Sequence, residues 1–536
     1  MSSGLHPVHS FHRRPAVRVL APWLILLSCG SSRITGGSVS PDVLLSQIQQ
    51  LIERGDLIVA NEQLSSALKK FPREPGLYNL LGVVAAQQGN FGAAESSFKK
   101  ATELMPQFTG AWLNLGRLYQ ESADRDRGAV RKGLEAYLEV LKFQPSNLEA
   151  NYQAAVLFQR QGAFQDSQRS LSSLPAEAQA RAQALAVRLA NHVALGERAS
   201  AQETSERLLR SADLSEADIA GIEAVLEAHN QTDLELTLFR GLDARGLASA
   251  GSLNHLGVLC EQAEKLVEAR AAFEKVVAAQ TPSAPLLLDL ARVAYKLGDL
   301  NGTLGYLAHA RDLEPLHSGI HFFFGMVCMD LNLPIEARRS LQEAVRLDPK
   351  NPYYNYALGA VTVQGRTPSE AVPYFENYIA SKPEDPRGRF ALGAAYFYSA
   401  NYSAARKELS VVKDRPETAA GAHYFLGRIA KQEDNLAEAE SEFAQAVAAN
   451  PKFPDGLAEL AHVHIRLDKY ADARNELERA IKLEPDSFRV NANLLILYQK
   501  TKDPRVEAQR ARFEEIKQKR SENEQLLWRT IEVRPY

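Results

Sequence analysis

Histidine and cysteine side chains are the first candidates for chemistry in this sequence, because these residue types bind metals and act as nucleophiles. His462 and His464 form the densest histidine pair of the chain. Residues two apart on a helix point to different faces, so the two imidazoles are not expected to share a metal ion. A structural role for both histidines is the simpler interpretation.

Motifs for catalysis or cofactor binding are missing from the rest of the sequence. It has no glycine-rich phosphate loop, no His-Glu-x-x-His, no Cys-x-x-Cys and no Gly-x-Ser-x-Gly pattern, which are short patterns with a defined chemical mechanism. The 62 basic and 65 acidic residues give a net charge of −3, which provides no basic surface for nucleic acid. We therefore expect no catalytic activity, no cofactor, no metal site and no nucleic-acid partner.

The N-terminal segment differs from the rest of the chain. Asp42 is the first acidic residue, and the basic stretch 12–14 precedes an apolar run over 19–27 that is too short to span a bilayer. This order predicts a signal peptide over 1–29 and a linker over 30–40. The sequence Leu-Leu-Ser-Cys that ends at Cys29 resembles the lipobox of bacterial lipoproteins, which implies lipidation of Cys29. An acid-free start rich in Arg and Ser also suits an organelle transit peptide, so an exported, envelope location and a cytoplasmic or organellar one both stay open.

The elements that would position any site repeat with a period of 34 residues. Prolines follow apolar helical stretches at intervals that fit this period, once a five-residue insertion near 122–127 is allowed. These prolines are Pro72, Pro106, Pro315, Pro349, Pro383, Pro451 and Pro485. Frames of 34 residues that begin at residue 41 then cover 41–521 with about fourteen repeats.

Small residues recur at fixed positions of this frame. Position 8 is glycine in seven frames and alanine in three, and positions 20 and 27 are alanine in nine and six frames. Large apolar residues such as Tyr78, Leu81 and Phe98 occupy complementary positions. Cys260 and Cys328 both fall at position 11, two repeat widths apart, which is beyond disulfide reach. We expect both to be small buried hydrophobic residues.

The segments GLYNLLGVVAAQQGNFGAAESSFKKATELMP and GAHYFLGRIAKQEDNLAEAESEFAQAVAANP resemble the tetratricopeptide repeat family at nearly every signature position. The resemblance implies an all-α fold, a right-handed α-solenoid of about fourteen helical hairpins. The first helix of each hairpin is expected over roughly positions 1–14 and the second over roughly positions 15–28. Glycines such as Gly55, Gly89, Gly162, Gly196 and Gly298 fall at the turn between the two helices, where a positive φ is needed.

The quality of the repeat divides the chain into blocks. We predict an N-terminal repeat block over 41–181, a degenerate segment over 182–249, a C-terminal block over 250–487, and a degenerate repeat with a capping helix over 488–536. Residues 182–249 lose the glycine at position 8 and the terminal proline. They form either two degenerate hairpins or a flexible joint.

Family members bind partners on the concave surface, which positions 2, 5, 9, 12 and 13 of the first helices line. The frames that begin at 318, 352 and 386 place apolar side chains there, and adjoining frames place basic ones. These candidate partner-binding residues are Phe322, Met326, Met329, Tyr353, Tyr356, Val363, Phe390, Phe397, Tyr398, Arg292, Lys296, Arg428 and Lys431. We expect an exposed aromatic surface that a partner covers, flanked by cations that orient an acidic segment. The alternative is that the solenoid buries part of this surface against itself.

The sequence as a whole predicts a non-enzymatic scaffold that binds proteins or peptides. A membrane contact is expected only through the lipid on Cys29. The alternative is an accessory subunit, or a remnant, of a glycan-modifying or biosynthetic transferase system.

Overall fold

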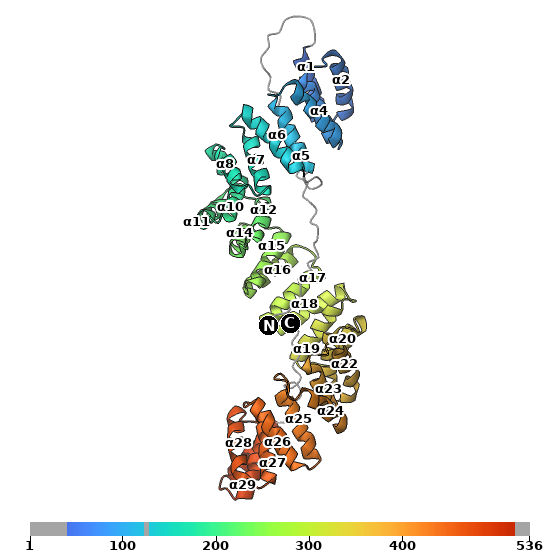
Figure 1. Cartoon of the computed structure of the whole chain (residues 1–536), viewed down its shortest axis with the longest axis vertical. Helices are drawn as coiled ribbons and strands as arrows, with labels where there is room; N and C mark the ends of the chain where they lie inside the picture. Colours follow the sequence, from blue (N-terminus) through green and yellow to red (C-terminus); the bar gives the residue numbers. More distant parts are fainter. Residues whose placement is uncertain (1–39, 123–127, 520–536) are drawn as a thin grey trace. The chain divides into compact units, whose positions relative to one another are not determined.

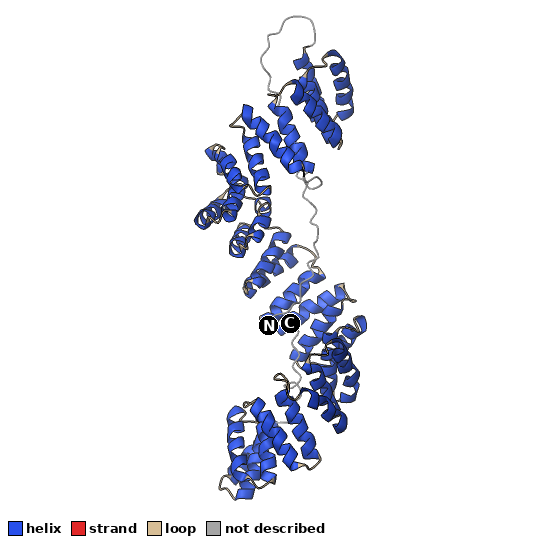
Figure 2. Ribbon diagram, viewed as in Figure 1, coloured by secondary structure: helices blue, strands red, loops and turns tan. Residues whose placement is uncertain are grey.

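The computed structural model describes residues 40–122 and 128–519, and within these ranges it contains helices and no strand (Figure 2). The chain forms two compact units, one that ends at Leu256 and one that begins at Gly257. The all-α solenoid predicted from the repeat is confirmed. The signal segment, Cys29 and the last residues of the predicted cap lie outside the described residues.

The helices of the first unit follow one another along the chain, and many of them are labelled in Figure 1. They are α1 (Pro41–Glu53), α2 (Leu57–Lys70), α3 (Pro75–Gln87), α4 (Phe91–Leu104), α5 (Thr109–Ser122), α6 (Ala129–Phe143), α7 (Leu148–Arg160), α8 (Phe164–Ser172), α9 (Ala176–Gln179), α10 (Ala182–Ala194), α11 (Arg198–Arg210), α12 (Glu216–Ala220), α13 (Glu223–Ala228) and α14 (Thr232–Ala244). Helix α15 (Ala250–Gln262) contains the boundary between the two units.

The second unit continues the same alternation of helices. They are α16 (Leu266–Ala279), α17 (Ala284–Lys296), α18 (Leu300–Leu313), α19 (Ser318–Asp330), α20 (Pro334–Leu347), α21 (Pro352–Gln364), α22 (Pro368–Ser381), α23 (Pro386–Tyr398), α24 (Tyr402–Val412), α25 (Ala419–Gln432), α26 (Leu436–Ala449), α27 (Pro454–Arg466), α28 (Tyr470–Leu483), α29 (Phe488–Thr501) and α30 (Val506–Lys519).

Consecutive helices pack in pairs as helical hairpins, and the first helix of each pair begins at or within one residue of a predicted frame start. Proline at the first position explains several of these starts. Pro75, Pro352, Pro386 and Pro454 each lie in the first turn of a helix, where the missing N–H is not needed and the fixed φ favours the helix. Side chains such as that of Asp385 cap the same ends, accepting a hydrogen bond from the backbone N–H of Arg387 at 3.0 Å.

The turn inside the hairpins uses a left-handed residue at position 15. Gly89 has φ +77°, and the same position is left-handed at Gly55, Gly162, Gly196 and Gly298. The predicted role of these glycines is therefore confirmed. In the later hairpins residues with a side chain take the same conformation, among them Asn332, Arg366, Ala400, Asp434 and Asp468.

The second helices begin at about position 17, so the prediction of position 15 is wrong by two residues. The reason is the turn itself, because position 15 leaves the helix and position 16 acts as the N-cap. In the second hairpin the N–H of Gly89 donates to the carbonyl of Ala86 at 2.9 Å, and that of Asn90 donates to Ala85 at 2.8 Å. The Asn90 side chain then accepts a hydrogen bond from Ala93 at 3.2 Å, which caps α4.

The small residues of the repeat lie where the two helices of a hairpin meet. The alanines at positions 20 and 27, for example Ala439 and Ala446, are fully buried. Cys260 and Cys328 are buried and not joined in a disulfide, as predicted, and burial raises the pKa of the Cys328 thiol to about 11. Large side chains pack around these small contacts, as in the apolar cluster of the second unit that extends from Tyr356 to Tyr498.

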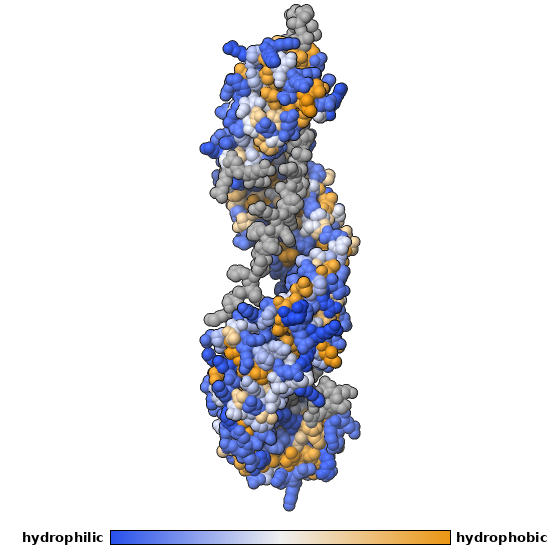
Figure 3. Space-filling view, turned by 90° about the vertical axis from the view of Figure 1, so that its right-hand side faces the viewer, coloured by the Kyte–Doolittle hydropathy of each residue, from blue (hydrophilic) through white to orange (hydrophobic). Residues whose placement is uncertain are grey.

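The described residues on the face drawn in Figure 3 are mostly hydrophilic, with hydrophobic residues in scattered patches. Across residues 40–122 and 128–519, every helix is too short or too polar to span a bilayer. Helices α10 to α14 form two hairpins within 182–249, and in the second of these Gly221 and Ile222 separate α12 from α13. The block boundaries given above, and the choice between a rigid stack and a joint over 182–249, stay predictions.

Candidate functional site

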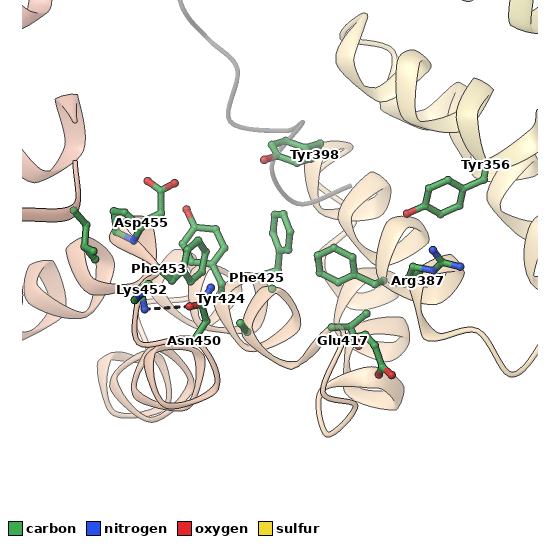
Figure 4. Close-up of a pocket in the computed structure, with 16 residues that line it drawn as sticks. Tyr356, Arg387, Tyr398, Glu417, Tyr424, Phe425, Asn450, Lys452, Phe453 and Asp455 are labelled. Carbon is green, nitrogen blue, oxygen red and sulfur yellow. Dashed lines mark hydrogen bonds between the residues drawn. The ribbon is translucent and has the colours of Figure 1, made fainter. Parts of the chain in front are cut away.

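A cavity of about 720 Å³ lies in the second unit, along the first helices of four successive hairpins. Its lining comes from α21, α23, α25 and α27, from the residues that precede α25 and α27, and from the end of α28. Residues at position 5 of three hairpins, Tyr356, Phe390 and Tyr424, form part of the lining. Figure 4 shows tyrosine side chains from these three hairpins around the cavity. The concave positions implied by the repeat therefore converge on one cavity here.

Aromatic rings make the floor of the cavity. The ring centroids of Phe390 and Phe425 lie 5.9 Å apart, and those of Tyr424 and Phe453 lie 5.1 Å apart. Phe390 packs directly on the backbone of Gly421, where a Cβ would lie 2.6 Å from its Cζ. Glycine at this place therefore lets the ring lie flat beside α25.

The hydroxyl of Tyr424 is the buried polar group of this cavity. Tyr424 is 1% exposed, and its hydroxyl has no hydrogen-bond partner among the described residues. Burial raises the pKa of Tyr424, while the nearby cations Arg489 and Arg428 act in the opposite direction. A buried hydroxyl without a partner is costly, so this group is suited to a ligand that supplies the missing hydrogen bond.

Arg428 provides a cation beside the aromatic floor. Its guanidinium lies 4.6 Å from the ring centroid of Phe397 and 5.7 Å from that of Tyr424, which is within cation–π range. Within 40–122 and 128–519, no carboxylate forms an ion pair with Arg428. Its charge is therefore available to an anionic group of a partner.

The neighbouring cations are held by buried carboxylates. Glu459, 4% exposed, pairs with both Lys431 and Arg489, and Arg489 Nε also lies 3.5 Å from Asp455. Burial lowers the pKa of Lys431 to about 8, with further lowering from Arg489, Arg428 and Arg466. This side of the cavity thus carries more positive than negative groups on α25, α27 and α29.

Three of the predicted binding residues, Tyr356, Phe390 and Tyr398, line the cavity, and Arg428 lies beside it. The expectation that the apolar residues are exposed is wrong for six of them, because neighbouring hairpins pack over their side chains. Met326, Met329, Tyr356, Val363, Phe390 and Phe397 are all buried.

Four of the predicted residues, Phe322, Tyr353, Arg292 and Lys296, are not among those that line the cavity. Tyr353 is 45% exposed, and Phe322 packs on Tyr354 with ring centroids 4.8 Å apart. Arg292 is bound by two carboxylates, with Nε 2.7 Å from Glu261 Oε1 and a second ion pair of 2.5 Å to Asp289. Lys296 also pairs with Glu261 at 3.2 Å. The structure therefore does not bring these basic residues to the aromatic cavity.

Sequence reasoning missed Tyr424, Phe425 and the segment 450–455. Tyr424 occupies position 5 of the hairpin that begins at 420, so extending the same map by one hairpin would have found it. Phe425 and Asn450 lie outside the concave positions of the frame, and nothing in the repeat marked them.

Comparisons with known proteins give the following matches. Models of the tetratricopeptide repeat match residues 45–107, 329–386 and 390–454, and a second such model matches 430–495. A segment is 27% identical over 119 residues to the "Tetratricopeptide repeat domain-containing protein PYG7, chloroplastic" of Arabidopsis thaliana, covering 22% of this chain. The match spans 38% of that relative's length.

Solved structures similar to this chain include the APC/C hetero-tetramer Cut9–Hcn1, with 13% identity, 86% of this chain and 96% of that chain covered, and a TM-score of 0.37. Naa15/Naa10 bound to HypK-THB has 14% identity, coverage of 88% and 94%, and a TM-score of 0.29. PilW, a type IV pilus biogenesis factor, has 16% identity, coverage of 39% and 98%, and a TM-score of 0.35.

Proposed function

Because this chain belongs to the tetratricopeptide repeat family, whose members bind other proteins or peptides, we propose that it is a non-enzymatic scaffold that captures a partner polypeptide in the cavity of its second unit. The observation that carries this proposal is the buried Tyr424 hydroxyl, which lines an aromatic cavity and has no partner among the described residues. A bound segment would donate to or accept from this hydroxyl.

The charges beside the cavity set the chemistry of that segment. Arg428 has no carboxylate partner among the described residues and lies over the rings of Phe397 and Tyr424. A partner segment with an apolar or aromatic side chain for the cavity and an acidic side chain for Arg428 complements both features.

Site-specific crosslinking in native cells tests the proposal. A photo-crosslinking phenylalanine derivative at position 398 faces the cavity, since Tyr398 lines it. The same derivative at position 411 is the control, since Val411 is 59% exposed on α24 and does not line the cavity. We expect one discrete crosslinked polypeptide from position 398 and not from 411.

The variant Arg428→Gln should reduce this crosslink, whereas Arg479→Gln, which changes an exposed arginine on α28, should not. Equal crosslinking from positions 398 and 411, or no effect of Arg428→Gln, would contradict the proposal.

We further propose that the chain acts in the cell envelope after export. The basic start, the short apolar run over 19–27 and the Leu-Leu-Ser-Cys sequence ending at Cys29 support this location. An organellar location is the second candidate, and the chloroplastic Arabidopsis relative favours it. Mass spectrometry of the N-terminal peptide of the native protein separates the two. A lipidated Cys29 supports the envelope, and an intact Met1 contradicts both locations. If the chain is cleaved without a lipid, cell fractionation decides, because recovery with the envelope supports export and recovery with an organelle contradicts it.

A further inference from the structure

Three ligand-type side chains of the first unit converge away from the aromatic cavity. Nε2 of His255 on α15 lies 2.8 Å from Glu235 Oε1 on α14 and 3.3 Å from Glu223 Oε1 on α13. One donor atom from each residue lies within 4.8 Å of the other two. Glu235 is 3% exposed, while the side chains of Glu223 and His255 are 17% and 20% exposed. A buried carboxylate thus faces two groups that solvent can still reach.

These glutamates stand where the repeat normally has its smallest residues. Glu223 is at position 8, which is glycine or alanine in ten hairpins, and Glu235 is at position 20, which is alanine in nine. The first helix of this hairpin is divided at Gly221 and Ile222 into α12 and α13. A polar cluster therefore replaces the close contact between helices in this hairpin. Burying a carboxylate is costly unless it is paired or binds a metal.

Both carboxylate oxygens approach the same nitrogen of His255. An imidazole nitrogen carries one proton, so it can donate a full hydrogen bond to only one of the two oxygens at a time. A divalent cation in place of that proton interacts with all three donor atoms. Phe239 packs against the imidazole with ring centroids 4.7 Å apart and holds the ring in this orientation.

Other His–Glu groups of the chain are arranged differently. In His464, Nδ1 lies 2.9 Å from Glu476 and Nε2 lies 3.1 Å from Glu440. Each carboxylate therefore faces its own ring nitrogen and can accept a hydrogen bond from it. His423 pairs with the single carboxylate of Glu442 at 2.6 Å. Convergence of two carboxylates on one imidazole nitrogen distinguishes the cluster at His255 from both.

We propose that Glu223, Glu235 and His255 bind one Zn²⁺ ion that joins α13, α14 and α15. One imidazole nitrogen and two carboxylate oxygens are ligands that Zn²⁺ accepts, at bond lengths of about 2.0–2.2 Å. Ligand atoms at these bond lengths lie about 3.3–3.6 Å apart in a tetrahedron. The 3.3 Å separation therefore already fits a shared ion, and the 2.8 Å separation would widen when the ion binds. A water molecule would complete the tetrahedron. The sequence pattern did not reveal this site because its residues are spread over three helices with no ligand motif.

Titration of Zn²⁺ into the metal-free, tag-free full chain, in competition with a chromophoric chelator, tests the proposal. We expect one equivalent of Zn²⁺ to bind, and Glu235→Gln and His255→Gln each to weaken its affinity by at least about tenfold. Zn²⁺ should also slow hydrogen exchange of the amides over 223–255 in the wild-type chain but not in these variants. Mg²⁺ should have neither effect, because it prefers six oxygen ligands.

His423→Gln is the matched control, since it removes an imidazole that pairs with one carboxylate, and it should leave Zn²⁺ affinity unchanged. Circular dichroism checks that every variant folds. The proposal is overturned if the wild-type chain binds no stoichiometric Zn²⁺, or if Glu235→Gln and His255→Gln bind it as tightly as wild type. The cluster would then be a hydrogen-bonded imidazole between two carboxyl groups.

Discussion

Gly427 lies against the ring of Phe443 so closely that a Cβ on the glycine would come within 2.8 Å of Cδ1 of the ring. The two residues occupy positions 8 and 24 of one hairpin, and the same approach recurs between Gly82 and Phe98. In the hairpin that has Leu189 at position 8, position 24 is the smaller Ser205. In these hairpins the space between the two helices limits the combined volume of the two side chains.

Gly427→Ala is expected to destabilise its hairpin by about 1–3 kcal/mol, because the new methyl group must displace a fully buried ring. Local free energies from hydrogen exchange of amides in α25 and α26 measure this effect without assuming that the whole array unfolds together. Adding Phe443→Leu should recover part of the loss, because the smaller side chain makes room for the methyl group.

Gly305→Ala is the matched control for that substitution. Gly305 lies within α18, and no atom would lie within 4 Å of its Cβ. The same change should therefore stabilise α18 by about 0.5–1 kcal/mol, since alanine favours the helix. If both substitutions change stability in the same direction, the contact at positions 8 and 24 is not what limits the hairpin.

Much of the fold could be predicted because the repeat imposes the same packing constraint many times. A single glycine such as Gly427 is ambiguous, but seven glycines at one position of the 34-residue frame identify a contact between helices. The start of α21 at Pro352 and that of α23 at Pro386 follow from the same frame.

The candidate site was less predictable, because burial depends on how far neighbouring hairpins overlap. The frame places Phe390 and Met326 on the concave side, but it could not indicate that their side chains are 5% and 2% exposed. A periodic pattern also treats Glu223 and Glu235 as mere departures from the repeat. Their convergence on His255 depends on three helices and has no signature in sequence spacing.

Ala400→Gly is expected to stabilise the turn between α23 and α24. Ala400 has φ +58°, and a left-handed conformation costs an L-residue about 1–2 kcal/mol. The greater freedom of glycine in the unfolded chain offsets about 0.4–1 kcal/mol of that cost. A net gain of about 0.5–1 kcal/mol should be measurable by hydrogen exchange of α23 and α24.

Gly89→Ala gives the reverse comparison, because Gly89 has φ +77° and no atom would lie within 4 Å of a Cβ there. Gly89→Ala should therefore lower stability through the backbone conformation alone. The loss should be similar in size to the gain expected from Ala400→Gly. Ala400→Gly should therefore raise the stability of its hairpin and Gly89→Ala should lower it. A stabilising Gly89→Ala would contradict the role given to position 15.

Tyr424→Phe should separate stability from binding. In the free chain the substitution removes a buried hydroxyl that has no partner among the described residues, so thermal stability should stay equal or rise. In the complex it removes a hydrogen bond worth about 1 kcal/mol, so affinity for the crosslinked partner should fall by roughly fivefold to tenfold. Unchanged affinity would show that the hydroxyl does not contact the partner.

Lys431 is expected to make stability depend on pH in the alkaline range. Its pKa falls from 10.5 to about 8 on folding, first because of burial and then because of Arg489 and Arg428. Between these two values the unfolded chain holds the proton that the folded chain has released, so the free energy of unfolding should rise with pH from about 8 to about 10.5. Hydrogen exchange of α25, corrected for intrinsic rates, measures this free energy in the wild-type chain and in Lys431→Met. We expect the variant to lack the rise with pH. A slope that persists in Lys431→Met would assign the effect to another group.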